Sequence, residues 1–307
     1  MTVVSRGYVD EDFRSVVGFL CETFRKMGSF QNWFPDRFEN SLVGRGGASQ
    51  TGDIRVWEEK EDAPARQTRR IVAVANPESP SHYFIQVDPA YGFLEREMLL
   101  WIEGHFVEKK KDQGKREKLG VHTIEGNSAR EKLLTELGYE KGEVAGYLRL
   151  RPANLPVPEF DVPEGYEVRS VRGRSDYDQL TAVTRLVFGH GESFNSELYG
   201  WIARCSFYRQ DPDLIAVAPD GTFASFCTFR MDPVSRITSL EPMGTHPDLR
   251  GLGLAKVLIF EGLRRAMRYN PALFYIGGAA DTPAANRLYD SVGFAKKFAE
   301  DCWYKEI

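Results

Sequence analysis

The stretch that decides the fold is SLEPMGTHPDLRGLGLAK, residues 239–256. A strand pattern runs to Thr245, a His-Pro pair turns the chain, and apolar residues then recur at helical spacing over 252–269. Gly251 and Gly253 let the backbone approach a ligand closely at this junction. The first N–H groups of a helix point to one spot and carry the positive end of its dipole. The turn therefore predicts a site for a phosphate or pyrophosphate.

Two common phosphate-binding motifs do not fit this turn. The Walker motif needs a Gly-Lys-Ser/Thr tripeptide, and none follows these glycines. The dinucleotide fingerprint needs a glycine or alanine in its sixth position, where Lys256 stands. The anion site that the turn predicts is therefore of another kind.

A second informative segment is AANRLYDSVGF, residues 284–294. It predicts a short helix that ends at Gly293 and leads into a strand. Taken alone, Tyr289 in this helix is an ordinary amphipathic contact, with Leu288 and Phe294 in the core.

Together the two segments resemble the GNAT superfamily of acyl-CoA-dependent N-acyltransferases. One motif, Arg-x-x-Gly-x-Gly/Ala, is met by Arg250, Gly253 and Ala255. The other, Ala-x-x-Leu-Tyr-x-x-x-Gly-Phe, is met by residues 285–294. The order of expected elements over 166–307 agrees with the family, and the chain is similar to the tandem subgroup, in which two such domains share one chain.

The expected fold class is α+β, with two GNAT-like domains, each a mixed, mostly antiparallel, splayed sheet flanked by helices. The division follows from residues 152–165, whose prolines remove backbone donors and favour extended chain. We expect a degenerate GNAT-like domain at 1–151, a proline-rich linker at 152–165 and a GNAT acyltransferase domain at 166–307. A closing strand pair is expected over 294–306.

The N-terminal half repeats the same series of elements more faintly. Strand patterns at 69–75 and 81–87 precede a long helix expected over 92–111. The tail at 127–140 echoes the one at 284–296, which indicates an internal duplication.

The first domain lacks the glycine turn. The corresponding stretch, residues 87–101, reads VDPAYGFLEREMLLW and keeps Gly92 alone. Glu95 and Glu97 place negative charge where a pyrophosphate would lie, and Leu134 stands in the place of Tyr289. We expect this domain to have lost cofactor chemistry and to shape the substrate cleft or support the second domain.

The resemblance implies an acetyl-CoA (coenzyme A) site in the second domain. Backbone groups of Met243 and Thr245 would pair with the pantetheine arm, and the turn that follows would hold the pyrophosphate. Many family members carry asparagine seven residues before the tyrosine, where Thr282 stands, and Asn286 lies nearby at another phase of the helix. The implied cofactor-binding residues are Met243, Thr245, Arg250, Gly251, Leu252, Gly253, Leu254, Ala255, Lys256 and Asn286.

Two residues are catalytic candidates. The resemblance implies that Tyr289 lies near the thioester sulfur as the general acid, since a phenol supplies a proton to a thiolate without adding charge. Glu241 is the candidate base, acting through water on an ammonium substrate. The usual carboxylate position falls nearer Ser239, and Pro242 is expected to introduce a bulge that re-aims Glu241. The alternative is a strand-end carboxylate that stabilises the helix start.

Other candidates carry less chemistry. His190 and Glu192 lie in a loop that either lines the acceptor site or is simply exposed and polar. The five histidines are too dispersed for metal spacing, so no metal site is expected. The cysteines at 21, 205, 227 and 302 have no CxxC spacing and predict neither zinc binding nor a disulfide framework.

Composition limits the classes of partner. A net charge of −4 argues against nucleic acid, and no run of 18 or more apolar residues indicates a membrane helix. The N-terminal segment carries acids where a secretory signal needs an apolar stretch, so a cytoplasmic location is expected. The expected partner is the amine of a small molecule or peptide, with the protein a monomer or homodimer.

The expected function is acetyl-CoA-dependent N-acetyl transfer, by direct attack of an amine on the thioester. The alternative is a non-catalytic acyl-CoA-binding or partner-binding pseudoenzyme. An intact Tyr289 beside an intact Arg250 turn favours the enzyme. Tandem enzymes of the mycothiol-synthase type share the layout, but no residue of the sequence points to that acceptor.

Overall fold

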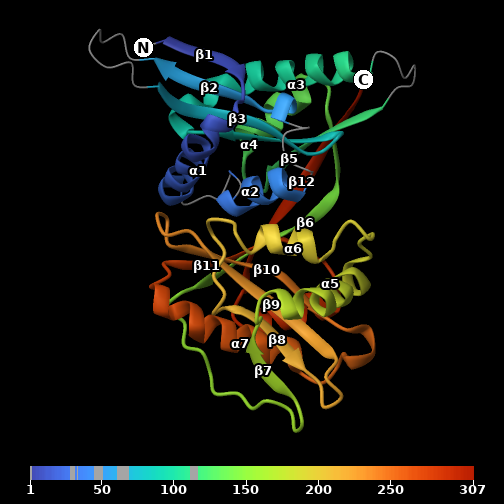
Figure 1. Ribbon diagram of the computed structural model, residues 1–307. Helices are drawn as coiled ribbons and strands as arrows, with labels where there is room; N and C mark the ends of the chain where they lie inside the picture. Colours follow the sequence, from blue (N-terminus) through green and yellow to red (C-terminus); the bar gives the residue numbers. More distant parts are fainter. Residues whose placement is uncertain (1, 28–31, 33, 45–50, 61–68, 111–116) are drawn as a thin grey trace. The chain divides into compact units, whose positions relative to one another are not determined.

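A computed structural model describes residues 2–27, 32, 34–44, 51–60, 69–110 and 117–307 (Figure 1). The chain divides into two compact units. Unit 1 comprises Met1–Gly146 and Phe298–Ile307, and unit 2 comprises Tyr147–Lys297. Two strands therefore begin in one unit and end in the other, namely β6 (Glu140–Pro152) and β12 (Lys296–Glu306).

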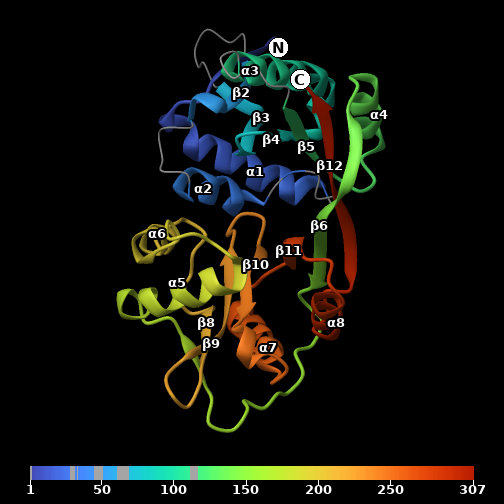
Figure 2. The ribbon, with the colours of Figure 1, turned by 90° about the vertical axis from the view of Figure 1, so that its right-hand side faces the viewer.

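Unit 1 is a mixed sheet covered by helices on both faces (Figure 2). Strands β4 and β5 are parallel, and the pairs β1–β2, β2–β3, β3–β4 and β5–β12 are antiparallel. Helices α1 and α2 pack in one apolar cluster and helices α3 and α4 in another. In sheet order the strands are β1 (Thr2–Gly7), β2 (Arg55–Lys60), β3 (Arg69–Ser79), β4 (His82–Val87), β5 (Lys118–Ile124), β12 and the first half of β6. The helices are α1 (Phe13–Met27), α2 (Pro35–Gly44), α3 (Glu95–Lys110) and α4 (Ser128–Glu136).

The helix expected over 92–111 is thus α3, preceded by a 3-10 turn at Pro89–Leu94. Residue 111 lies outside the described residues.

Unit 2 has the same construction, with β10 and β11 parallel and the other described pairs antiparallel. Helices α5 and α6 cover one face of its sheet, and α7 and α8 cover the other (Figure 2). In sheet order its strands are the second half of β6, β11 (Leu273–Ala279), β10 (Ile237–Thr245), β9 (Phe223–Met231), β8 (Asp213–Val217) and β7 (Glu167–Ser170). The helices are α5 (Arg174–Phe188), α6 (Ser196–Ile202), α7 (Leu254–Ala266) and α8 (Pro283–Ser291).

Strand β8 illustrates why this sequence makes a sandwiched sheet. Leu214 and Ala216 belong to the apolar cluster under α7, whereas Ile215 belongs to the cluster under α5. Because side chains alternate along a strand, an apolar residue at every position is buried against one helix layer or the other.

The expected splay is present in both units. In unit 2, parallel pairing joins only three pairs of these described strands, from Ile237 with Leu273 to Ser239 with Tyr275. Strand β10 then continues along β9 and strand β11 along β6. In unit 1, β4 and β5 separate after two pairs. The fold is therefore the expected pair of GNAT-like, mostly antiparallel, splayed sheets.

The division of the chain differs from the one expected. The final strand does not close the second domain, because β12 pairs with β5 from Glu300 to Glu306 and buries Trp303 in the core of unit 1. Conversely, residues 147–152 pair with β11 and belong to unit 2. Beyond Pro152 the linker holds neither helix nor strand, as expected, but it lies within unit 2 rather than at a junction.

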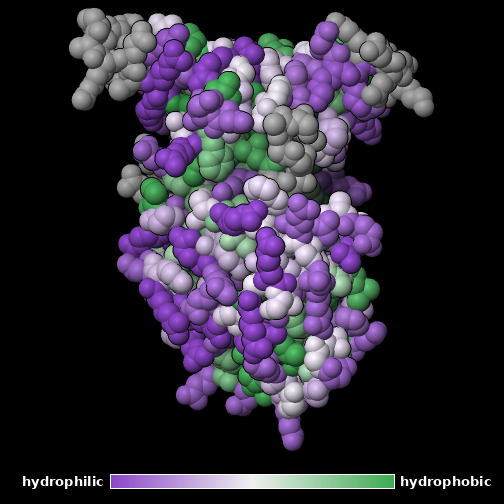
Figure 3. Space-filling view, viewed as in Figure 1, coloured by the Kyte–Doolittle hydropathy of each residue, from purple (hydrophilic) through white to green (hydrophobic). Residues whose placement is uncertain are grey.

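Polar residues cover most of the face shown in Figure 3. Among the described helices, none is long and apolar enough to cross a membrane. The four cysteines, all within the described residues, form no disulfide. Over the part of the chain that the structure describes, no three His, Cys, Asp or Glu side chains are grouped to hold a metal ion.

Candidate active site

The glycine turn forms the start of α7. Gly251 and Gly253 adopt positive φ angles of 83° and 78°, which only glycine adopts without strain. No atom lies within 4 Å of the position that a Cβ would take at either residue, so the turn borders open space. The first helical hydrogen bond runs from Val257 N–H to Gly253 O (3.1 Å), and no described side chain caps this end. The preceding N–H groups are therefore available to an anion.

Two exposed cations flank this turn. Arg250 donates from Nε to the carbonyl oxygen of Thr245 (3.4 Å), a long bond that leaves its guanidinium largely in solvent. Lys256 lies in the first turn of α7, with Nζ 5.6 Å from the ring centre of Phe260. Both charges reinforce the field of the helix start.

The free edge of β10 carries backbone donors and acceptors. His246 N–H donates to Ala224 O of the β9 side (2.8 Å). Backbone groups alternate in direction along an antiparallel pair, so Met243 and Thr245 direct their N–H and C=O groups away from β9. That is the side from which β11 has diverged. The two residues predicted to bind pantetheine thus lie on the open edge.

A β-bulge lies at Glu241, as expected from Pro242. The register between β10 and β9 passes from Leu240 opposite Phe229 to Met243 opposite Cys227, so β10 carries one extra residue. The predicted bulge is confirmed. The bulge places the half-buried Glu241 where β10 and β11 separate. The extra residue turns its carboxylate away from the regular alternation of side chains along the strand.

Tyr289 lies on α8, whose N-cap is Thr282, with its hydroxyl accepting from Ala285 N–H (3.1 Å). The half-buried phenol packs edge-on against Phe294, with ring centres 6.4 Å apart. Within the described residues its hydroxyl makes no hydrogen bond, although Glu241 lies within electrostatic range.

The environment of Tyr289 keeps it protonated. Burial raises its pKa to about 12, with the neighbouring Cys227 and Glu241 acting in the same direction and Arg149 opposing them. At neutral pH the phenol is therefore a hydrogen-bond donor rather than an anion.

The side chain of Asn286 is hydrogen-bonded at both of its polar ends. Its side-chain oxygen accepts from Arg149 and its amide donates to Asp281 Oδ1 (2.7 Å). Both polar ends are thus used inside a network with β6. Arg149 itself was missed by the sequence reasoning, because nothing in the strand pattern of YLRLR indicates which helix it contacts.

The loop after α5 lies over the same sheet. His190 is exposed and packs between Phe188 and Phe194, at ring-centre distances of 5.6 and 5.2 Å. Phe188 in turn contacts Phe226 of β9, the residue opposite Gly244 of β10. Glu192 is almost fully exposed, 3.7 Å from Arg185. The aromatic side chains, which the sequence reasoning did not single out, connect this loop to the strands that carry the site.

Comparison with known proteins bears on the fold and on the family of unit 2. A model of the acetyltransferase (GNAT) family matches residues 178–294, which include the glycine turn and Tyr289. The similarity to the GNAT family covers this segment of unit 2.

Solved structures extend this GNAT assignment to the fold of the whole chain. A GCN5-related N-acetyltransferase from Sphaerobacter thermophilus superimposes with a TM-score of 0.67 at 17% identity, covering 99% of this chain and 95% of that one. A tandem GNAT protein from the clavulanic acid biosynthesis pathway gives 0.67 at 13% identity, covering 99% and 98%.

The curated proteins similar to this chain are named mycothiol acetyltransferases. The one from Salinispora arenicola is 29% identical over 177 residues, 53% of this chain and 55% of the relative. The one from Nocardiopsis dassonvillei is 31% identical over 153 residues, 46% of each chain. The match thus spans only about half the length of these relatives.

The first GNAT-like unit fills its equivalent edge with its own side chain. Asp88 N–H donates to Val72 O (2.9 Å), so the backbone of Val87 points to the open edge of β4, as that of Thr245 does in β10. There the buried Asn32 side chain accepts from Val87 N–H (3.1 Å) and donates to Val87 O (3.0 Å). A carboxamide thus occupies the edge that the second unit leaves open.

The helix start of unit 1 is occupied as well. Glu95, the first residue of α3, accepts two hydrogen bonds from the buried Arg130 of α4 (2.8 and 3.0 Å). Glu97 accepts from Trp57 Nε1 (2.8 Å). Two carboxylates of the protein, each bonded to another side chain, therefore lie in the first turn of this helix.

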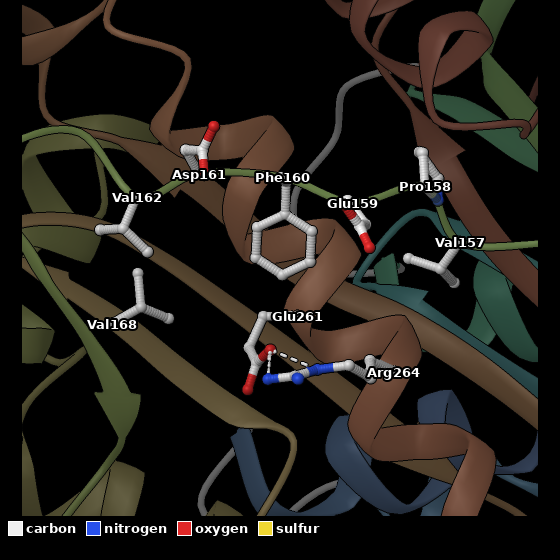
Figure 4. Close-up of a pocket in the computed structure, with 9 residues that line it drawn as sticks. All are labelled: Val157, Pro158, Glu159, Phe160, Asp161, Val162, Val168, Glu261 and Arg264. Carbon is white, nitrogen blue, oxygen red and sulfur yellow. Dashed lines mark hydrogen bonds and ion pairs between the residues drawn. The ribbon is translucent and has the colours of Figure 1, made fainter.

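A separate hollow of about 560 Å³ lies between the linker and the later turns of α7 (Figure 4). Phe160 and the neighbouring linker residues form one wall, and the ion pair of Glu261 with Arg264 forms the other. None of the predicted cofactor-binding or catalytic residues of the GNAT site lines it.

Proposed function

We propose that the chain is an N-acyltransferase that moves an acetyl or similar short acyl group from acyl-CoA to an amine. The proposal rests on one coincidence in unit 2. The open edge of β10 and the uncapped start of α7 belong to one strand-turn-helix segment. The unbonded hydroxyl of Tyr289 belongs to α8, the next α-helix in the chain.

The available donors fit a coenzyme A molecule. Its pantetheine arm carries amides that match the N–H and C=O groups of Met243 and Thr245, and its pyrophosphate matches a helix start flanked by cations. The residues proposed for the pyrophosphate are Arg250, Gly251, Leu252, Gly253, Leu254, Ala255 and Lys256. Asn286 is left out, because both ends of its side chain are already bonded.

Acyl-CoA supplies the activated thioester, and two side chains handle protons. Glu241 is proposed to take a proton from the acceptor ammonium through water, for which a half-buried carboxylate at the mouth of the splay is suited. Tyr289 is proposed to donate a hydrogen bond and then a proton to the departing sulfur. Because burial raises the pKa of Tyr289 to about 12, it holds this proton throughout the physiological range.

We propose that unit 1 binds no coenzyme A. Asn32 already makes both hydrogen bonds of its open edge, and Glu95 with Arg130 occupies the start of α3. A pyrophosphate there would meet a buried ion pair rather than free N–H groups.

The names of the relatives suggest an acceptor class to test first. Their printed name, mycothiol acetyltransferase, supports unacetylated mycothiol as the first amine to test. A panel of that compound, simple amines and peptides would be incubated with acetyl-CoA, and the release of free thiol followed. We expect release that depends on one acceptor class. Acetyl-CoA binding without transfer to any amine would instead support the pseudoenzyme alternative.

A further inference from the structure

Arg149 is a buried cation from a strand that precedes the linker. It lies opposite Ile276 in the pairing of β6 with β11, and its side chain is 1% exposed. Isolated buried charges are costly, and the carboxylate that this one meets, Asp290, is 58% exposed. The cost indicates that the position has a use for the charge.

All hydrogen-bond partners of Arg149 lie on α8 or directly after it. Nη1 donates to Asp290 Oδ1 (2.7 Å) and to Phe294 O (2.8 Å), and Nη2 donates to the side-chain oxygen of Asn286. Asn286 and Asp290 are four residues apart and share one face of α8, whereas Phe294 follows the helix. The bonds to Asn286 and Asp290 therefore restrict the rotation of α8 about its axis, and the bond to Phe294 O holds the segment that follows it.

Tyr289 lies beside the guanidinium of Arg149. The guanidinium carbon of Arg149 is 5.7 Å from the centre of the Tyr289 ring, within the range of a cation–π contact. The charged or titratable groups that face the phenol are Arg149 from β6, Cys227 from β9 and Glu241 from β10. Of these, Arg149 is the cation, and it opposes the other two.

We propose that Arg149 is the positioning residue for Tyr289, directing its hydroxyl and stabilising the negative charge that develops on it as the proton leaves. The inference deepens the proposed function and rests on it for the role of Tyr289. Through the pairing of β6 with β11, a residue from before the linker thus contributes to the site of unit 2.

Arg151 provides a matched control. It is equally buried, stands two residues further along β6 and donates to main-chain carbonyls, among them Val292 O (3.0 Å) and Leu155 O (2.8 Å). Its guanidinium lies 5.8 Å from the ring centre of Phe274 instead of Tyr289. A purely structural role for buried arginines on this strand predicts equal effects at both positions.

The first test needs no substrate. 3,5-Difluorotyrosine at position 289, whose fluorines lower the phenol pKa into an accessible range, is titrated by ¹⁹F NMR in the full chain. Arg149→Met should raise this apparent pKa, because a cation is lost, and Arg151→Met should leave it unchanged. Should Arg149→Met not fold, Arg149→Lys and Arg151→Lys are compared, and only the former should move the ¹⁹F resonance.

The second test is a double-mutant cycle with the acceptor found above. Arg149→Met should lower kcat at least about tenfold with KM for acetyl-CoA within about threefold, and Arg149→Lys should recover part of the loss. In the Tyr289→Phe background Arg149→Met should cost nothing further.

The inference is overturned if the fluorotyrosine at position 289 titrates alike in the position-149 and position-151 variants. It is also overturned if the fold-losses of kcat in Arg149→Met and Tyr289→Phe multiply in the double variant. The proposed function fails separately, through absence of transfer by the unmodified chain.

Discussion

Replacing Tyr289 with phenylalanine removes one hydroxyl and keeps the ring. Because that hydroxyl bonds to no described residue, no internal hydrogen bond is lost, and the ring contact with Phe294 remains. We expect the free energy of unfolding to change by no more than about 0.5 kcal/mol, the range of neutral surface substitutions. The melting temperature should then move by no more than about 2 °C.

Turnover should respond very differently. A general acid contributes about 10²–10⁴-fold, which corresponds to about 2.7–5.4 kcal/mol of activation free energy at about 1.36 kcal/mol per tenfold. The initial rate of free-thiol release is measured at saturating acetyl-CoA and acceptor, with acetyl-CoA affinity measured separately. We expect kcat to fall by this factor while the affinity stays within about threefold.

Tyr147→Phe is the control for this experiment. Its half-buried phenol donates to Asp281 Oδ2 (3.4 Å) in the same region of unit 2, but the proposed chemistry does not use it. Turnover of Tyr147→Phe should remain near that of the unmodified chain. Equal turnover in the Tyr289 and Tyr147 variants would refute the assignment of Tyr289 as the acid.

Three further outcomes are expected. Burial raises the pKa of Asp176, but the hydrogen bonds from Arg169 and from Arg172 N–H, together with the charges of both arginines, lower it more, so its folded pKa lies below its usual value. The contribution of Asp176 to the free energy of unfolding is therefore complete above about pH 4 and decreases as the pH falls further. Asp176→Asn should lose about 1–3 kcal/mol of this free energy at pH 7 and less at pH 3, as measured by urea unfolding. Asn32→Ala leaves the Val87 N–H and C=O unpaired and should cost about 1–3 kcal/mol in the same assay, with acetyl-CoA affinity unchanged in calorimetry. Glu241→Gln should lower kcat about 10²–10⁴-fold, and a loss below about threefold in thiol release would exclude it as the base.

The local chemistry of the site could be read from the sequence. Gly251 and Gly253 do adopt the positive φ angles that a ligand-facing turn needs, and Pro242 does accompany a bulge at Glu241. These features depend on neighbouring residues only, so the sequence contains the information that fixes them.

The passage of β6 and β12 from one unit to the other could not be predicted in the same way. Alternating apolar residues predict that β6 and β12 are strands, but not which sheet each one joins, because pairing partners lie far apart in the chain. Arg149 was missed for this reason, since its contact with α8 exists only once β6 pairs with β11. The contact of Asn286 with that same arginine could not be predicted for the same reason.

The occupation of the open edge of β4 in unit 1 by a side chain could not be predicted from the sequence either. The lost glycine turn and the acidic residues Glu95 and Glu97 indicated a degenerate site. That Asn32, fifty-five residues before Val87, supplies both hydrogen bonds of the open edge follows only from the tertiary structure.

The central claim is that one coenzyme A binds per chain, at the glycine turn of unit 2. Arg250→Glu reverses a charge beside the proposed pyrophosphate, and Arg268→Glu makes the same change beyond the other end of α7, where the arginine pairs with Asp211. The most direct test is isothermal titration calorimetry of acetyl-CoA into these three proteins.

The account predicts a stoichiometry of one, affinity at least about tenfold weaker in Arg250→Glu, and affinity near that of the unmodified chain in Arg268→Glu. Two equivalent sites, or equal affinity in all three proteins, would contradict it.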